Sequence, residues 1–188
     1  MTKAESKVID FIKKHILLFL LVAVTIIAIF LRVCGMDFQS DDFNSFLNSW
    51  WSIIKLNDFT GLATQVGNYN IPYQVIIYLM TLLPLNALYA YKIVSIIFDF
   101  VLAISTAMLV YSFAKNNRRL KAILTYSAVL LSATVIFNSS FWAQCDSIYT
   151  SFIILAILFL HKDKPIASFV FTGIAFAFKL QTVFIIPV

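Results

Sequence analysis

The sequence predicts an all-α fold, a polytopic bundle of about five membrane-spanning helices with juxtamembrane amphipathic helices in its first outer loop. The first observation is composition: the 188 residues are 61% hydrophobic and 12% charged, with a mean hydropathy of +0.91. Soluble domains are nearer half apolar and a quarter charged. The second is that the apolar runs are too long and continuous for barrel strands. The third is that Lys and Arg gather in a few short segments, as the positive-inside rule expects.

The first predicted span covers residues 16–33, close to the ~20 residues that cross a bilayer. Lys13 and Lys14 precede it, and Arg32 follows the uncharged stretch without a small-residue cleavage site. We therefore expect an uncleaved anchor with the N-terminus in the cytoplasm.

The chain then forms an extracytoplasmic loop, residues 34–88, in which residues 40–55 have the pattern of an interfacial helix. One face carries apolar side chains and the opposite face polar ones, with Trp50 and Trp51 expected at headgroup depth. The apolar face comprises Phe43, Phe46, Leu47, Trp50 and Ile54, and the polar face Asp41, Asn44, Asn48, Ser52 and Lys55. The alternative interpretation is that Ser40 caps this helix and that Asp41 and Asp42 favour the positive end of its dipole.

Residues 71–83 are apolar but short for a span, so we expect a second interfacial helix there. This choice keeps the basic loop 115–121 in the cytoplasm. The remaining predicted spans are 89–113, 122–137, 148–160 and 166–188, with part of the loop before the short fourth span helical at membrane depth.

The resulting topology places ten of the fourteen Lys and Arg inside: four near the N-terminus, four in loop 115–121 and two in turn 161–164. The chain is predicted as one module over residues 1–188. Its apolar end, residues 184–188, suggests the N-terminal portion of a longer protein.

Three ionisable residues fall within the predicted spans: Lys92, Asp99 and Lys179. Such residues are costly in lipid and are functional candidates by default. The alternatives are that Lys92 snorkels to the headgroups and that Asp99 has a partner on another helix or is buried as a neutral acid.

The predicted outer segments gather carboxylates, amides and aromatic rings. This combination suits a sugar, because rings stack on its apolar face, amides bind its hydroxyls and a carboxylate removes a hydroxyl proton. Nearby cations suit a phosphate. Taken singly, Asn138 and Asp146 are better interpreted as helix caps. The convergence of all these residues on one face of the membrane favours a functional site. The candidates are Asp41, Asp42, Asn68, Tyr69, Asn70, Asn138, Trp142, Gln144, Asp146, Tyr149, Lys179 and Gln181.

Other classes of function lack their motifs. No metal-ligand spacing, glycine-rich phosphate loop or Ser–His pair occurs, so no cofactor is predicted, although two acids beside a sugar phosphate could hold a divalent cation. The net charge of +5 does not indicate a nucleic-acid partner, because the cations follow the membrane topology. Cys34 and Cys145 are both expected outside; they allow one disulfide and do not demand it.

Four segments carry a family resemblance: SDDFNSFL from Ser40, NYNIPY from Asn68, NSSFWAQCDSIY from Asn138 and FAFKLQ from Phe176. Together with the order of the features above, they resemble the GT-C glycosyltransferases, polytopic enzymes that use polyprenyl- or dolichyl-phosphate sugars. More closely, the chain is similar to bacterial mannosyltransferase-like proteins related to the second mannosyltransferase of GPI-anchor assembly, and the resemblance covers nearly the whole chain.

The resemblance implies a catalytic acid at Asp42, with Asp41 as its neighbour, and a cation near the lipid phosphate at Lys92. The expected reaction transfers a hexose, mannose by the family label, from a polyprenyl-phosphate donor to a hydroxyl of a glycan, lipid or protein acceptor, with inversion. The cell membrane is the expected location, with the site on the extracytoplasmic face. Asp146 would orient a substrate, and Lys92 and Lys179 would neutralise the departing phosphate. The family is about twice this length, so this chain alone is expected to be inactive.

Two alternatives from other classes remain open at this stage. One is a transporter or flippase fragment in which Lys92, Asp99 and Lys179 line a polar path. The other is a non-catalytic subunit of polysaccharide assembly.

Overall fold

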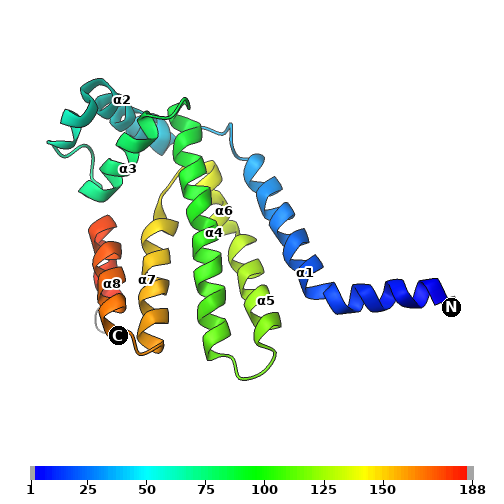
Figure 1. Cartoon of the computed structure of the whole chain (residues 1–188). Helices are drawn as coiled ribbons and strands as arrows, with labels where there is room; N and C mark the ends of the chain where they lie inside the picture. The colour runs from blue at the N-terminus through cyan, green and yellow to red at the C-terminus, as the bar shows by residue number, and fades with distance from the viewer. Residues whose placement is uncertain (1–2, 186–188) are drawn as a thin grey trace.

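The computed structural model describes residues 3–185, and every regular element in this range is a helix or helical turn (Figure 1). The predicted all-helical class is therefore confirmed for residues 3–185. The final residues of the predicted fifth span and the apolar end at Pro187 and Val188 lie outside the described residues. In chain order the elements are α1 (Lys3–Val33), the π-helical turn η1 (Phe43–Leu47), α2 (Asn48–Asn57), the 3₁₀ turn η2 (Asp58–Leu62), α3 (Ile71–Thr81), α4 (Ala87–Phe113), α5 (Arg118–Leu130), α6 (Ala133–Ile136), the π-helical turn η3 (Phe137–Phe141), α7 (Asp146–His161), α8 (Pro165–Phe178) and the 3₁₀ turn η4 (Leu180–Ile185).

Within the described residues, two helical segments are long and apolar enough to cross a membrane: Phe11–Val33 of α1 and the whole of α4. A third crossing results if α5 and the segment Ala133–Phe141, which bend by 51° at a short break, count as one span. Helices α7 and α8 are apolar but have only 16 and 14 residues. The membrane character predicted from composition is supported, whereas length and composition identify two or three candidate spans in place of five.

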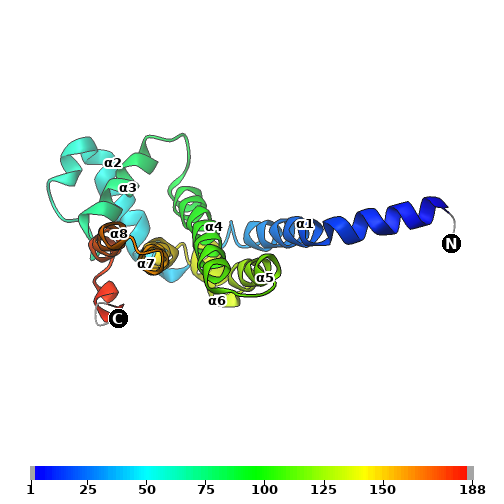
Figure 2. The same cartoon turned by 60° about the horizontal axis from the view of Figure 1, so that its bottom comes forward.

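Helix α4 is the centre of the bundle, with α5 on one side and α7 on the other (Figures 1 and 2). Helix α8 packs on the far side of α7, and α1 packs on α5; the first part of α1 bends away from the bundle (Figure 1). Ala28 of α1 and Ala103 of α4 are fully buried in the core that these helices share with Tyr126 and Leu130 of α5. Small side chains at such positions let membrane helices approach closely.

The predicted third span, residues 122–137, is not one continuous helix. Helix α5 begins earlier, at Arg118, and ends at Leu130, after which Ser132 is extended with ψ of 124°. The break frees the carbonyl of Leu130, which accepts a hydrogen bond of 3.0 Å from Arg32 Nη1. The prediction that part of the following loop is helical is confirmed by η3.

The predicted fifth span is also interrupted, because α8 ends at Phe178. Lys179 is extended, with φ of −150° and ψ of 126°, and the chain then forms η4. The prediction of one helix carrying both Lys179 and Gln181 is therefore wrong. Extended backbone brings the Lys179 ammonium to Asp146 at the start of α7, and Figure 2 shows the chain turning away from the axis of α8 after this point.

Helices α2 and α3 form a packed layer at one end of α4, which we call the α2/α3 end (Figure 1). Its core holds Trp50 and Trp51 of α2, Tyr73 of α3 and Tyr91 of α4, all buried. The tryptophans thus pack within protein instead of lying against lipid. Phe46, predicted on one apolar face with Phe43, Leu47 and Ile54, is 52% exposed while those three are buried, because η1 is a π-helical turn and shifts the register of the side chains.

The loop between α2 and α3 is held by the buried side chain of Gln74. Its amide nitrogen donates to the carbonyls of Gly61 (2.9 Å) and Thr64 (2.6 Å), and its amide oxygen accepts from the Val66 N–H (3.1 Å). Gly67 follows with φ of 77°, in a position where a Cβ would overlap the indole of Trp50. With 11 residues, α3 is too short to cross a bilayer.

The two basic connections lie together at the opposite end of the bundle, which we call the basic end (Figure 1). One joins α4 to α5 and the other joins α7 to α8. In the second, Asp163 adopts φ of 54°, the left-handed conformation that commonly ends a helix, and Pro165 begins α8. Both connections therefore lie at the same end of the bundle, an arrangement compatible with the charge pattern of the predicted topology.

A buried carboxylate links four segments near the middle of the molecule. Asp99 of α4 is fully buried and forms an ion pair with Arg32 of α1, the Nε–Oδ2 distance being 2.9 Å. The hydroxyls of Ser139 in η3 and Ser147 in α7 also donate to it, each at 2.5 Å. The interpretation that Asp99 has a partner on another helix is confirmed, and the partner is Arg32.

Replacing Asp99 by Asn should destabilise the fold by about 3–5 kcal/mol, because it leaves the buried Arg32 charge without its counter-ion. Thermal unfolding of the detergent-solubilised protein measures this. The control is Asp163→Asn, which removes the same charge from an exposed turn and tolerates the same backbone conformation. A double variant, Arg32→Met with Asp99→Leu, should lose less stability than Asp99→Asn alone, because neither charge then remains buried. Equal melting temperatures for Asp99→Asn and the wild type would contradict this stabilising role of the Asp99–Arg32 pair.

The topology can be tested by labelling introduced cysteines with a membrane-impermeant maleimide. Cys34 is exposed and is replaced by Ser, whereas burial raises the pKa of the Cys145 thiol to about 12. Because the thiolate is the reactive form, Cys145 should stay silent near neutral pH. Asn70→Cys should then be labelled in intact cells and Asn116→Cys only after permeabilisation. Labelling of both from the same side would refute the predicted topology.

Candidate functional site

The polar residues predicted from the outer segments meet at the α2/α3 end, where a hydrogen-bonded chain joins three distant segments. Gln144 Nε2 donates to Asp42 Oδ2 at 2.9 Å. The Tyr69 hydroxyl donates to Gln144 Oε1 at 3.0 Å. Gln144 therefore orients the Asp42 carboxylate and leaves its other oxygen, Oδ1, without a hydrogen bond from the described residues.

The position of Asp42 is set by the start of its helix. Ser40 accepts a hydrogen bond from the Phe43 N–H at 3.1 Å, so the predicted cap is confirmed. The same hydroxyl donates to the carbonyl of Trp142 at 3.4 Å. One serine thus holds the start of the helix beside the segment that carries Gln144. Directly after Asp42 comes η1, and π-helical turns occur often at functional sites.

Gln144 is presented by an unusual backbone. Ala143 is fully buried and has φ of 56°, a left-handed conformation that is uncommon for a residue with a Cβ. The Gln144 N–H donates to the Asn138 carbonyl at 2.8 Å, which closes the loop after η3. Strained backbone of this kind costs about 1–3 kcal/mol and is found preferentially at functional sites.

A second cluster lies beside the first. Asn138 Nδ2 donates to Asp146 Oδ2 at 3.0 Å, and the Lys179 ammonium donates to Asp146 Oδ1. The ammonium also lies 5.7 Å from the ring centroid of Tyr69 and 5.3 Å from that of Tyr149. Two aromatic faces and one carboxylate therefore hold a cation that is still partly exposed.

Asp99 positions this second cluster through two serines that are next to cluster residues in the chain. Ser139 and Ser147, which bind Asp99, directly follow Asn138 and Asp146 in the chain. The two serine hydroxyls bind Asp99 in the interior, whereas the preceding side chains, Asn138 and Asp146, form a hydrogen bond with each other. Neither serine nor Arg32 was predicted as part of the site from the sequence. The one signal for them was that a buried carboxylate at Asp99 requires hydrogen-bond donors.

Two cavities adjoin these clusters. The smaller, of about 240 Å³, is lined by Asp42, Phe46, Leu47, Trp50, Asn68, Tyr69 and Gln144. The larger, of about 590 Å³, is lined by Asn68, Tyr69, Asn70, Phe178, Lys179, Leu180, Gln181, Val183 and Phe184. They share Asn68 and Tyr69, so these two residues separate a carboxylate-bearing cavity from a cation-bearing one. Phe46 and Trp50 form part of the first cavity, a role that the sequence pattern did not reveal.

The ionisation of Tyr69 suits its place between the cavities. Burial, and then the nearby groups of Cys145, Asp146 and Asp42, raise the pKa of its phenol well above the ordinary value. The phenol therefore stays protonated at neutral pH and remains a hydrogen-bond donor to Gln144.

Three predicted site residues lie elsewhere. Asp41 and Trp142 are exposed and line neither cavity. Lys92 is fully buried, and its ammonium donates to the backbone carbonyls of Gly35 (2.7 Å), Met36 (3.0 Å) and Phe38 (2.5 Å). It thereby holds the chain that leaves α1, and it also lines neither cavity.

The three residues that the transporter interpretation places along a polar path each have a separate partner. Lys92 binds backbone carbonyls, Asp99 binds Arg32, and Lys179 binds Asp146. No hydrogen bond or ion pair joins these three residues to one another in the described part of the chain.

The arrangement offers an oriented carboxylate, a neighbouring cation and an aromatic wall around two contiguous cavities. Such a set can bind a sugar and its phosphate and accept a proton from a hydroxyl. Within residues 3–185, no three His, Cys, Asp or Glu side chains lie together as a metal-binding group.

Comparison of the chain with protein-family models, with curated proteins and with solved structures found no match.

Proposed function

We propose that the chain is the N-terminal membrane module of a GT-C-type glycosyltransferase that moves a hexose from a polyprenyl-phosphate donor to an acceptor hydroxyl, with inversion. The observation that carries this proposal is the meeting of Asp42, Gln144 and Tyr69 in one hydrogen-bonded chain beside the Asp146–Lys179 pair. These residues come from four separate segments at one end of the bundle. All of them except Asp146 line the two adjoining cavities, and Asp146 pairs with Lys179.

In the proposed reaction the acceptor hydroxyl lies in the smaller cavity, against Phe46 and Trp50. Asp42 Oδ1, which is free of hydrogen bonds from described residues, takes the hydroxyl proton as general base. The oxygen forms a bond to the anomeric carbon of the donor, and the bond from that carbon to the phosphate oxygen breaks. The phosphate leaves with its electron pair, and Lys179 at the larger cavity stabilises the charge that develops.

The proposed donor is linked to a lipid, so the site must lie close to the membrane leaflet that holds the donor. We propose five spans, in which α7 and α8 also cross, with the α2/α3 end extracytoplasmic. A helix of 16 residues is about 24 Å long, somewhat less than the ~30 Å hydrocarbon core. Local thinning or the polar segments at the ends of α7 and α8 would accommodate the difference. The basic connections at the opposite end support this orientation.

The direct test is transfer from a panel of polyprenyl-phosphate sugars in membranes that contain the complete protein. Asp42→Asn should lower transfer by about 10²–10⁴-fold, the usual contribution of a general base. Gln144 can still donate to the Asn side-chain oxygen, so expression and melting should not change.

The matched control is Asp58→Asn, which alters an exposed acid of the same loop outside both cavities. Full activity of Asp42→Asn would remove this residue from the mechanism. Absence of transfer from every donor in the panel by the wild-type protein would count against the proposed activity itself.

Replacing Lys179 by Met should reduce kcat more than donor binding, because the ammonium is proposed to act on charge that develops as the phosphate leaves. Lys179→Arg should restore part of the rate. Lys92→Met, in contrast, should lower the melting temperature, since it removes the donor shared by three backbone carbonyls. Steady-state kinetics and thermal unfolding separate the two effects. Unchanged kcat in Lys179→Met would contradict the assigned role.

A further inference from the structure

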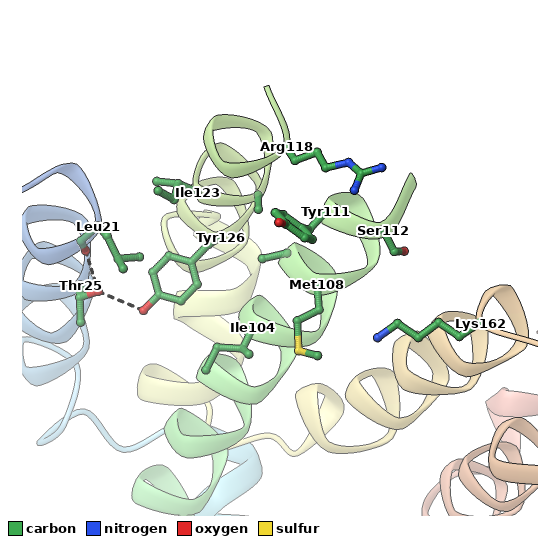
Figure 3. Close-up of a pocket in the computed structure, with 12 residues that line it drawn as sticks. Leu21, Thr25, Ile104, Met108, Tyr111, Ser112, Arg118, Ile123, Tyr126 and Lys162 are labelled. Atoms are coloured by element: carbon green, nitrogen blue, oxygen red, sulfur yellow. Dashed lines mark hydrogen bonds between the residues drawn. The ribbon is translucent and has the colours of Figure 1, made fainter. Parts of the chain in front are cut away.

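A large cavity lies at the basic end, far from the site above. It has a volume of about 640 Å³, within the usual range for ligand pockets of ~300–1,000 Å³. Its walls come from α1, α4 and α5, as Figure 3 shows. Most of the wall is apolar: Leu21, Ile104, Ala107, Met108, Ala122 and Ile123.

Two cations border this cavity from different elements. Figure 3 shows Arg118 extending beside Tyr111 and Lys162 extending from the α7–α8 turn toward Met108. Arg118 Nε donates to the Ala114 carbonyl at 2.6 Å, and the guanidinium carbon lies 5.9 Å from the centroid of the Tyr111 ring. Its terminal nitrogens have no hydrogen-bond partner in the described part of the chain, and neither does the Lys162 ammonium.

Among the described residues, the missing partner distinguishes Arg118 and Lys162 from the cations Arg32, Lys92 and Lys179 elsewhere in the bundle. Arg32 and Lys179 are each paired with a carboxylate, and Lys92 has three carbonyls. No acidic residue lines the cavity. A neighbouring cavity shares four of its lining residues and is bordered by further cations, Lys13, Lys14 and Arg119.

We propose that this cavity binds one anionic phospholipid from the leaflet at the basic end, with its phosphate between Arg118 and Lys162 and an acyl chain along the apolar wall. Charge complementarity supports an anionic headgroup, and an apolar wall open toward the membrane supports a chain that is already in lipid. Basic pockets between membrane helices on the cytoplasmic side are typical sites for such headgroups. The inference does not depend on the glycosyltransferase proposal.

The test measures lipid bound to the complete protein, purified in detergent, by native mass spectrometry with phosphatidylglycerol and phosphatidylcholine as probes. The wild type should retain phosphatidylglycerol in preference. Arg118→Gln combined with Lys162→Gln should weaken phosphatidylglycerol binding by roughly 10- to 30-fold, given the contribution of each cation near a lipid phosphate. The control, Lys115→Gln with Lys164→Gln, removes the same charge from residues that do not line the cavity and should bind as the wild type does.

A second variant separates a specific site from surface charge. Ile104 is half-exposed and lines the cavity, so Ile104→Trp places a bulkier side chain against the apolar wall where the acyl chain would lie and keeps both cations. It should also lose phosphatidylglycerol, while melting in phosphatidylcholine micelles reports that the fold is intact. Equal loss in the control double variant, equal retention of both lipids by the wild type, or full retention by Ile104→Trp would each overturn the proposal.

Discussion

The arrangement of the molecule depends on one carboxylate removed from water. A buried charge is costly unless it is paired and hydrogen-bonded, and Asp99 meets this condition with Arg32, Ser139 and Ser147. The donors come from α1, η3 and α7, so satisfying a single side chain of α4 determines how three other elements approach it. The two serines directly follow Asn138 and Asp146, which belong to the candidate site. The interior ion pair and the outer polar clusters are therefore structurally linked through these serines.

Much of the fold could be predicted from the sequence because hydrophobic runs and charge asymmetry are local signals. The starts of α4, α7 and α8 lie within two residues of the predicted spans. The interruptions were not predictable in the same way. The extended residue Lys179 and the break after Leu130 each release a group that pairs with a partner far along the chain, and such a partner is invisible in a hydropathy pattern.

The candidate site was predictable as a set of residue types but not as a geometry. Asp42, Gln144, Tyr69, Asp146 and Lys179 were all selected from the sequence, since polar side chains are informative in so apolar a chain. Which of them touch depends on Ser40, on the left-handed Ala143 and on η3. Phe46 illustrates the limit: a regular helical period places it with the core, whereas the π-helical turn directs it to a cavity.

The π-helical turns η1 and η3 have a consequence for how this scaffold could vary. Each accommodates one residue more than an α-helical turn would, so a one-residue deletion inside Phe43–Leu47 would restore regular winding without unravelling the helix. Because the wider turn takes up the extra residue, the segments on either side would keep nearly the same relative orientation after the deletion. Losing one residue at this turn would therefore redirect the side chains within it, Phe46 among them, while the helix on either side keeps its packing.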